Sequence, residues 1–265
     1  MAHPQYEILA LRYATYQQRV AGNNFMFPDV HDAPMPIDYY VWAIRAPDGR
    51  AIVVDTGFGG QVAHRRLRPV TRMPDLLLRD AGIDPAEVRD VVITHMHYDH
   101  AGNLDLFPNA TFHIQDAEMA YCTGRCMCHA VLRMPMEVDD VVSAVRHVYS
   151  GRMAFHQGTE EIAPGITLHL IGGHTGGLQA VRVPTARGWV VLAGDAAHFW
   201  ANIRTRNPFP LVVDVAQMLE GYGILEGLAD GPDHIIPGHD PLVASRFPPL
   251  PGHPDIVRLD LPPVG

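Results

Sequence analysis

Four short apolar runs in this chain each stop at a histidine or an aspartate, and this repetition constrains the fold more than any other feature of the sequence. The runs occupy residues 91–94, 166–171, 189–193 and 234–236. In three of the four cases a glycine directly precedes the polar residue. In α/β proteins, sites form in the loops after the carboxyl ends of strands, and glycine lets the backbone pass close to a ligand. The pattern therefore predicts strands whose ends gather around one cleft.

The polar residues after these runs are of the types that bind divalent metal ions. The first run is followed by the dense cluster His-x-His-x-Asp-His, and the other three runs add one residue each. Together these residues are His95, His97, Asp99, His100, His174, Asp195 and His239. Imidazole nitrogen and carboxylate oxygen suit zinc and similar cations, and this set exceeds the needs of one tetrahedral ion with an open position. The sequence predicts two ions that share one aspartate.

The three later residues each have an ordinary alternative. A lone histidine such as His174 is more often a hydrogen-bonded loop residue than a ligand, and Asp195 alone suits a turn or a helix cap. The dense cluster differs, because three imidazoles and a carboxylate within six positions have little structural use. The later residues are interpreted as ligands because they share the setting of the cluster. Two ions about 3.5–4 Å apart hold a hydroxide between them, which indicates hydrolytic chemistry.

The remaining pattern predicts strands that alternate with helices. Strands are expected within 38–58, with a turn at 47–49, and at 110–115, and a helix at 73–83. Asp84 is expected to cap a short helix, and Asp116 a longer one. Strands that are apolar throughout imply sheets covered by helices, as in a layered α/β protein. The pattern leaves open whether there is one sheet or two.

No repeat or low-complexity linker divides the chain. Residues 1–265 are therefore expected to form a single domain, and a proline-rich tail from about 247 is expected to run extended over its surface. The start of the sequence lacks the features of a secretion signal, and no run approaches membrane-spanning length. The expectation is a cytoplasmic protein with no membrane partner.

The formal charge of −9 disfavours nucleic acid as a partner, because an acidic surface repels phosphate. The densest basic stretch, residues 64–72, is interpreted as a solvated helix face. Three clustered cysteines, Cys122, Cys126 and Cys128, make a poor disulfide framework. A structural zinc site with His129 is conceivable there, but the preferred interpretation is that the cysteines are small apolar residues.

Residues 94–100 resemble the H-x-H-x-D-H signature of the metallo-β-lactamase superfamily. Asp55-Thr56-Gly57 is similar to the early D-T-G turn of that superfamily, and His174, Asp195 and His239 follow in the expected order. The resemblance implies an αββα sandwich with a dinuclear site along one edge of its two sheets. It also implies a ligand assignment: His95, His97 and His174 on one metal, Asp99, His100 and His239 on the other, Asp195 bridging, and Asp55 orienting ligands from behind.

Among the branches of the superfamily, the N-acyl-homoserine lactone lactonase group is the most similar. The spacing between bridging aspartate and last histidine, 239 − 195 = 44, resembles that group. Only 265 − 239 = 26 residues follow the last histidine, too few for the C-terminal domain of glyoxalase II. All cysteines precede His174, which disfavours the commonest zinc β-lactamases. The lactonase group has a tyrosine three residues after the bridging aspartate, and this chain has His198 at that position.

The resemblance implies a hydrolase that opens a lactone by attack of a metal-bridging hydroxide, with quorum quenching as a conceivable role. Asp99 is expected to relay the proton and His198 to stabilise the oxyanion, as catalytic residues. The two divalent ions are expected to be zinc, with iron, manganese or cobalt as alternatives. Hydrolysis of another ester, a thioester or a cyclic amide on the same site is the alternative function. An iron-dependent oxygenase of the persulfide dioxygenase type, or a sensor without activity, is a further alternative.

Substrate contacts are the least constrained expectation. Phe27, within the aromatic stretch 23–31, and Phe58 are predicted to line an apolar pocket wall, although loop aromatics equally often fill the core. Arg204, with Arg206, is predicted to hold a carboxylate of a small acidic or heteroaromatic lactone, against the alternative of solvated surface arginines. His198 completes the predicted substrate-binding set. The stretch 23–31 serves a homodimer contact as readily as a pocket.

Overall fold

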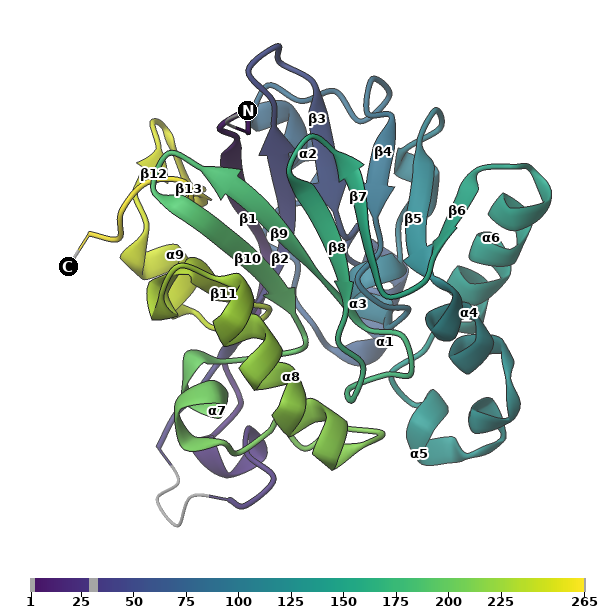
Figure 1. Ribbon diagram of the computed structural model, residues 1–265. Helices are drawn as coiled ribbons and strands as arrows, with labels where there is room; N and C mark the ends of the chain where they lie inside the picture. Colours follow the sequence, from purple (N-terminus) through teal and green to yellow (C-terminus); the bar gives the residue numbers. More distant parts are fainter. Residues whose placement is uncertain (1–2, 29–32, 265) are drawn as a thin grey trace.

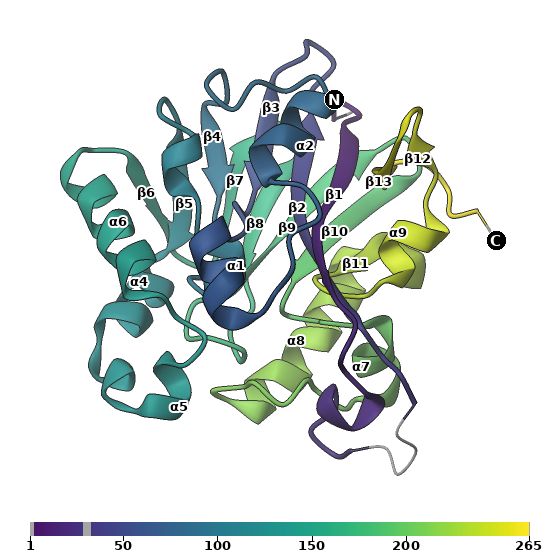
Figure 2. The same ribbon diagram turned by 180° about the vertical axis from the view of Figure 1, so that it is seen from behind.

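The computed structural model describes residues 3–28 and 33–264. Two β-sheets face each other, and helices cover both outer faces (Figures 1 and 2). This four-layer arrangement confirms the αββα sandwich implied by the sequence. Within the described residues, no helix is long and apolar enough to cross a membrane.

The first sheet has the strand order β12-β13-β1-β2-β3-β4-β5-β6. Its strands are β1 (Glu7–Tyr16), β2 (Ile37–Arg45), β3 (Ala51–Val54), β4 (Asp90–Val92), β5 (Thr111–Gln115), β6 (Met153–His156), β12 (Pro249–Leu250) and β13 (His253–Arg258). The second sheet has the order β11-β10-β9-β8-β7. It consists of β7 (Thr159–Ala163), β8 (Ile166–Leu170), β9 (Gln179–Thr185), β10 (Gly188–Gly194) and β11 (Ile235–Pro237).

The helices are short and occupy the outer layers. They are α1 (Gly60–Arg66), α2 (Pro74–Asp80), α3 (Tyr98–Ala101), α4 (Asp116–Thr123), α5 (Ala130–Arg133), α6 (Val138–Tyr149), α7 (Trp200–Thr205), α8 (Val215–Leu228) and α9 (Leu242–Arg246). Single 3-10 turns are η1 (Ala21–Asn23), η2 (Leu104–Leu106), η3 (Arg125–Cys128) and η4 (Pro232–His234). Helices α1 and α2 lie on the first sheet (Figure 2), and α8 lies on the second (Figure 1).

Strand β1 shows why the sheets are covered on both faces. Ile8 and Ala10 point into the core between the sheets, whereas Leu9 and Leu11 point into the core under α2. Successive side chains of a strand face opposite sides, so a strand buried on both faces is apolar throughout. A third core lies between α8 and the second sheet.

Three local expectations differ from the structure. Residues 84–87 form a turn and not a helix, since β4 begins at Asp90 and leaves no room for further turns of helix. Asp116 is the first residue of α4, and its carboxylate accepts a hydrogen bond from Gln157 Nε2 at 2.7 Å. The tail beyond residue 247 is extended, but it does not run over the surface as expected. Its residues 253–258 form β13, which pairs with β1 and is buried at Ile256 and Val257.

Strand direction brings distant segments to one end of the sandwich. Strands β3 and β4 run parallel, as do β10 and β11. Strands β8 and β10 are both antiparallel to β9 and therefore run in the same direction. The predicted ligand residues follow the carboxyl ends of β4, β8, β10 and β11, and Asp55 follows that of β3.

Candidate metal centre

All seven predicted metal ligands converge, although they come from four separate segments. One group contains His95, His97, His174 and Asp195, and a second contains Asp99, His100 and His239. Within each group, one nitrogen or oxygen atom of every member lies within 4.8 Å of those of the others, and every member is buried. A third overlapping group adds His198 to Asp195 and His239.

Asp195 lies between the two groups and presents one carboxylate oxygen to each. Its Oδ2 is 3.1 Å from His174 Nε2 and 3.7 Å from His95 Nε2. Its Oδ1 is 3.0 Å from His239 Nε2 and 3.3 Å from His100 Nε2. The side chain follows β10 through Gly194, whose positive φ of 51° lets the chain turn there. The two oxygens are thus placed as a bridge between two cations requires.

The outward ring nitrogens of the histidines are held by the surrounding structure. His100 Nδ1 lies 2.7 Å from Asp55 Oδ2, His174 Nδ1 lies 2.6 Å from the Leu211 carbonyl, and His239 Nδ1 lies 2.8 Å from the Asp38 carbonyl. These contacts leave each Nε2 facing the centre. His97 is the exception, because it is Nδ1 that faces inward, 3.0 Å from His174 Nε2. Such contacts fix the tautomer and orientation of metal-binding imidazoles.

Several inward-facing atoms lie close to one another but are not aligned for a hydrogen bond. His95 Nε2, His100 Nε2 and Asp195 Oδ1 are fully buried and make no hydrogen bond to any described residue. Leaving buried polar atoms unpaired is costly, and such atoms in folded proteins usually serve a ligand or ion. The chemistry of these donors fits divalent cations.

Burial and charge set the protonation of this cluster in the absence of metal. Burial lowers the pKa of His95 and His97 well below the usual value for histidine, and neighbouring imidazoles lower it further. For His100, burial acts in the same direction, but Asp195, Asp55 and Asp99 outweigh it and raise the pKa well above its usual value. Neutral histidine is the form that binds a metal ion, so His95 and His97 are ready to act as ligands.

Asp55 supports the centre from behind. It accepts hydrogen bonds from the backbone N–H of Thr94 at 2.7 Å and from its hydroxyl at 2.8 Å. Its other neighbour is His100, as described above. Asp55 has a φ of 62°, in the left-handed region that non-glycine residues rarely adopt. A strained residue that orients two others is typical of a functional site.

Glu118 is a supporting residue that the sequence did not reveal. This α4 side chain is fully buried and accepts hydrogen bonds from Met96 N (2.8 Å), Thr175 Oγ1 (2.6 Å) and Gly177 N (3.0 Å). It joins the loop after β4 to the loop after β8, which carry His95, His97 and His174. No local pattern identifies it, since its partners lie far away in the sequence.

Replacing Glu118 with alanine should lower the free energy of unfolding by at least about 3 kcal/mol, because buried donors that lose their acceptor cost about 1–3 kcal/mol each. Urea denaturation of the metal-free protein measures this loss. Glu87→Ala is the matched control, since the Glu87 side chain is 77% exposed. A loss as small as that of the control, about 0.5 kcal/mol, would show that the three hydrogen bonds contribute little.

A cleft of about 270 Å³ opens over the two donor groups. The floor of the cleft, on the side of the donor groups, is formed by five residues: His97, Asp99, Asp195, His198 and His239. The other lining residues are Arg19, Ile37, Tyr39, Arg66, Arg68, Tyr98, Met134, Pro135, Phe209, Pro210 and Leu211. None of these eleven was predicted: ten lie outside the ligand motifs in the sequence, and Tyr98 lies within the 94–100 motif at a position between two predicted ligands.

Of the predicted substrate residues, His198 lies in this cleft. Its Nε2 is 3.2 Å from Asp195 Oδ2, and its ring stacks on Phe209 with centroids 3.8 Å apart. Burial lowers the pKa of His198 to about 3, so the ring is neutral. Phe58 is fully buried against Tyr13 and Tyr39, behind the cleft wall.

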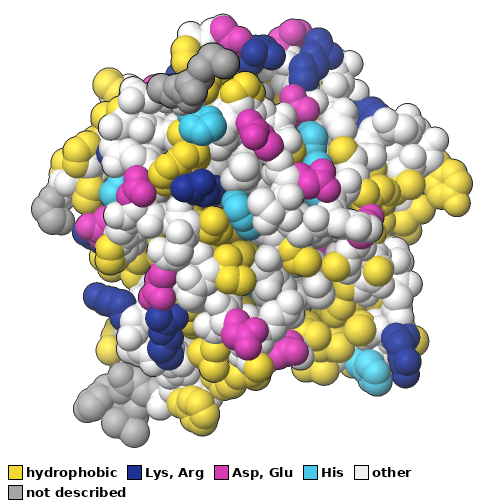
Figure 3. Space-filling view, in the orientation of Figure 1, with side chains coloured by type: hydrophobic (Ala, Val, Ile, Leu, Met, Phe, Trp, Pro, Cys, Tyr) yellow, Lys and Arg dark blue, Asp and Glu magenta, His cyan; other side chains and the backbone are white. Residues whose placement is uncertain are grey.

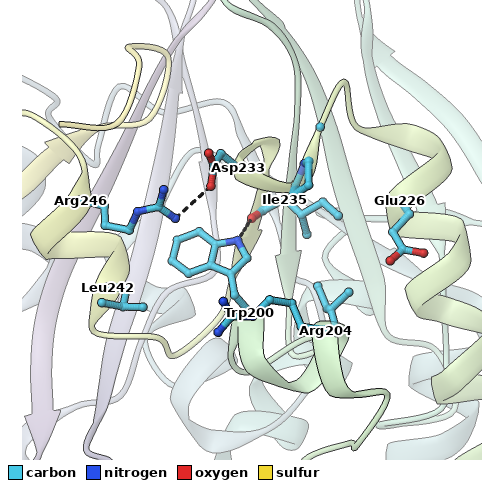
Figure 4. Close-up of a pocket in the computed structure, with 10 residues that line it drawn as sticks. Trp200, Arg204, Glu226, Asp233, Ile235, Leu242 and Arg246 are labelled. Carbon is cyan, nitrogen blue, oxygen red and sulfur yellow. Dashed lines mark hydrogen bonds and ion pairs between the residues drawn. The ribbon is translucent and has the colours of Figure 1, made fainter. Parts of the chain in front are cut away.

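The structure does not bring Phe27 or Arg204 into the cleft. Phe27 is 76% exposed and is not among the lining residues. Arg204 lines a different pocket, of about 720 Å³, together with Trp200 and Arg246 (Figure 4). Arg206 forms an ion pair with Glu226 at 2.6 Å. Helix α7 follows the metal-binding segment closely, but it directs these arginines away from the donor groups.

Two further expectations concern cysteines and surface charge. The three cysteines are free, with Cys122 buried and Cys128 exposed, and none belongs to a potential metal group within the described residues. On the face shown in Figure 3, basic and acidic side chains of the described residues are scattered among apolar ones.

The sequence is similar to those of several known proteins. The sequence profile of the metallo-beta-lactamase superfamily matches residues 36–243. A probable metallo-hydrolase of Mycobacterium bovis is 28% identical over 200 residues, which cover 69% of this chain and 64% of that protein. The N-acyl homoserine lactonase AttM of Rhizobium johnstonii is 58% identical over 103 residues, 34% of this chain and 38% of the lactonase.

Similarity to solved structures extends over nearly the whole chain. A structure of N-acyl homoserine lactone hydrolase, with the product N-hexanoyl-L-homoserine bound at its catalytic metal center, superimposes with a TM-score of 0.72. The match covers 96% of this chain and 100% of that one at 18% identity. Likeness at this identity shows a shared fold. This chain spans less than two thirds of the length of the Mycobacterium bovis relative.

Proposed function

This chain belongs to the metallo-beta-lactamase superfamily, and on that premise we propose that it is a metal-dependent hydrolase that opens lactone rings. The observation that carries the proposal is the pair of buried donor groups joined by the two oxygens of Asp195. The choice of a lactone is supported by the names of the Rhizobium relative and of the similar solved structure. Hydrolysis of another ester, a thioester or a cyclic amide is the alternative on the same site.

The donor groups fit two divalent cations. His95 Nε2, His97 Nδ1 and His174 Nε2 would hold the first cation. Asp99, His100 Nε2 and His239 Nε2 would hold the second, with Asp195 between them. Nitrogen and oxygen donors favour zinc, and iron, manganese and cobalt suit the same set. When bound, such cations supply a water ionised at neutral pH and polarise a carbonyl group.

Side chains of the protein would accept and pass on protons during this reaction, and others would hold them in position. Asp99 lines the cleft, with Oδ2 3.7 Å from His239 Nε2 and 3.9 Å from His100 Nε2, so its carboxylate can accept a proton and pass it to a leaving alkoxide. The Tyr13 hydroxyl donates to the Asp99 carbonyl at 2.9 Å and holds this residue in place.

His198 lies beside the bridging carboxylate as a neutral ring. Its Nε2–H can donate to Asp195 Oδ2, and Phe209 fixes the plane of the ring. His198 would therefore orient Asp195, and its position in the cleft also allows contact with the substrate carbonyl.

Replacing His198 with phenylalanine should lower kcat by about 10- to 100-fold and leave the bound metal at two ions per chain, since partners behind metal ligands have effects of this size. Steady-state kinetics together with metal analysis measure both quantities. His64→Ala, on the exposed face of α1, is the control. An unchanged kcat would exclude His198 from catalysis and from the orientation of Asp195.

A panel of substrates tests the proposed function. The metal-loaded protein is assayed with a pH indicator against γ- and δ-lactones, linear esters and thioesters, because hydrolysis of each releases a proton at neutral pH. Cyclic amides are assayed by chromatography, because the amine that their hydrolysis frees takes up that proton. We expect kcat/KM for the best lactone to exceed that for the best linear ester by at least about tenfold, a difference of about 1.4 kcal/mol in activation free energy. Turnover of esters or thioesters alone, or of no compound in the panel, would contradict the assignment.

A further inference from the structure

We infer that the cleft selects small lactones that carry a carboxylate, and that the guanidinium of Arg68, with Arg19 beside it, binds that carboxylate. The inference rests on the proposed function, since it names the class of lactone that the same site accepts. It moves the carboxylate-binding role expected of Arg204 and Arg206 to arginines that the structure places in the cleft.

Three arginines line the cleft, but they are not equivalent. The guanidinium of Arg66 is neutralised by Glu137, with Nε 2.7 Å from Oε1, and it also lies 4.1 Å from the centre of the Tyr98 ring. Arg19 and Arg68 form no ion pair within 4.0 Å with any carboxylate of residues 3–28 and 33–264. The cleft thus carries two guanidinium charges that the described part of the chain leaves unpaired.

Arg68 is held rigidly with one side of its guanidinium unused. Its Nε donates to the Tyr39 hydroxyl at 2.9 Å, and Nη1 donates to the Arg66 carbonyl at 2.9 Å. The Tyr16 ring lies under the guanidinium, 3.8 Å from Cζ. Nη2 makes no hydrogen bond to a described residue. A half-buried, fixed guanidinium with a free N–H edge is prepared for a planar anion.

Arg19 faces the same space from the segment after β1. Its Nε donates to Asn24 Oδ1 at 2.6 Å, and its guanidinium lies 4.7 Å from the centre of the Phe209 ring, the ring on which His198 stacks. Burial lowers the pKa of Arg19, and the positive charge of Arg68 acts in the same direction, which reflects how close the two cations are. An anion between them would relieve this repulsion.

Size and charge together define the ligand class. The cleft has a volume of about 270 Å³, just below the range of about 300–1,000 Å³ that is typical of ligand pockets. A five- or six-membered lactone with one short substituent fits such a volume, whereas a long acyl chain would extend outside it. The whole chain has a formal charge of −9, so two neighbouring guanidinium groups without a carboxylate partner among the described residues are a local exception that can attract an anion.

The rival interpretation is that Arg68 only holds Tyr39 and the chain after α1. A matched substrate pair separates the two roles: γ-butyrolactone bearing a carboxylate on the ring carbon next to the ring oxygen, and the methyl ester of that acid. The two compounds share the ring and the reacting bond, and they differ in charge and by one methyl group. A structural defect would affect both compounds equally, whereas loss of an anion contact would affect one.

We expect Arg68→Gln to lower kcat/KM for the carboxylate lactone by about 10- to 100-fold, mainly through KM, since hydrogen bonds between charged groups have effects of this size. For the methyl ester, turnover of the lactone ring should stay within about twofold of wild type. Arg68→Lys keeps the charge and should recover part of the loss. Arg204→Gln, which alters an arginine outside the cleft, should change neither substrate.

Calorimetry with the ring-opened hydroxy-dicarboxylate and metal-free protein provides a readout apart from activity. Wild type should bind this compound, and Arg68→Gln should weaken binding at least tenfold. If neither lactone is hydrolysed but this binding difference appears, the proposed function fails and the carboxylate site stands. Equal losses on both lactones, or binding that Arg68→Gln leaves unchanged, would overturn the inference.

Discussion

Replacing Asp195 with alanine should lower lactone hydrolysis by at least about a thousandfold, or about 4 kcal/mol in activation free energy, and should reduce bound metal from two ions per chain to one or none. The reason is geometric. Among the described residues, Asp195 is the one carboxylate whose two oxygens face both donor groups, at 3.1 Å from His174 Nε2 and 3.0 Å from His239 Nε2. Without it, each group keeps three donors, but the shared negative charge that lets two cations lie close together is lost.

Kinetics and elemental analysis of the same preparation measure both effects. Asp48→Ala is the control, since the Asp48 side chain is 53% exposed and pairs with Arg50 at the surface. The variant Asp195→Asn keeps the size of the side chain and removes its charge, so it separates the loss of a bridge from the creation of a cavity. Activity within tenfold of wild type in either Asp195 variant would contradict the bridging role.

Removal of metal should lower the melting temperature by on the order of 10 °C or more. A cation that binds only the folded state at about 1,000 times its Kd adds about 4.1 kcal/mol to the free energy of unfolding, and 1 kcal/mol corresponds to about 2–4 °C for a protein of this size. Two sites enlarge the effect. The metal-free cluster is also unfavourable in itself, because His95 Nε2, His100 Nε2 and Asp195 Oδ1 are buried without hydrogen bonds to the described residues.

Calorimetric melting of the chelated protein, before and after addition of zinc, measures this difference. The Asp195→Ala variant is the matched control, since it should respond much less to both treatments. A melting temperature that chelation leaves unchanged, in a preparation shown to have lost its metal, would mean that the donor groups do not contribute to stability through metal binding.

The fold and the convergence of the seven predicted ligand residues were predictable because both leave local signals in the sequence. Each ligand follows an apolar strand, and strand direction then brings the strand ends together regardless of their distance in the sequence. The αββα architecture required the resemblance of the 94–100 signature to a known superfamily. Apolar strands alone left open whether one sheet or two are present.

Residues around the ligands were less predictable, because their positions depend on directions that sequence order does not give. Phe58 follows Gly57, whose φ of 69° turns the chain, so the ring packs into the core and not into the cleft. Arg204 is near Asp195 in the sequence but lies on a helix face directed toward another pocket. Glu118 and Arg68 act through contacts with segments far away in the chain, which produce no periodic pattern.

Local helix signals also failed where tertiary structure left no space. Asp84 and Pro85 form a typical helix start, but the chain enters β4 at Asp90, and the residues between them form only a turn. The single-domain organisation and the homodimer stay predictions, as does the cytoplasmic location.

Anomalous X-ray diffraction at the absorption edge of the bound metal is the most direct test of the two-cation centre. Crystals of protein purified without added chelator should show two anomalous peaks about 3.5–4 Å apart. One peak should lie among His95, His97 and His174, the other among Asp99, His100 and His239, with Asp195 between them. No peak, or peaks confined to another part of the molecule such as the cysteine segment, would contradict the metal centre and the hydrolytic function proposed from it.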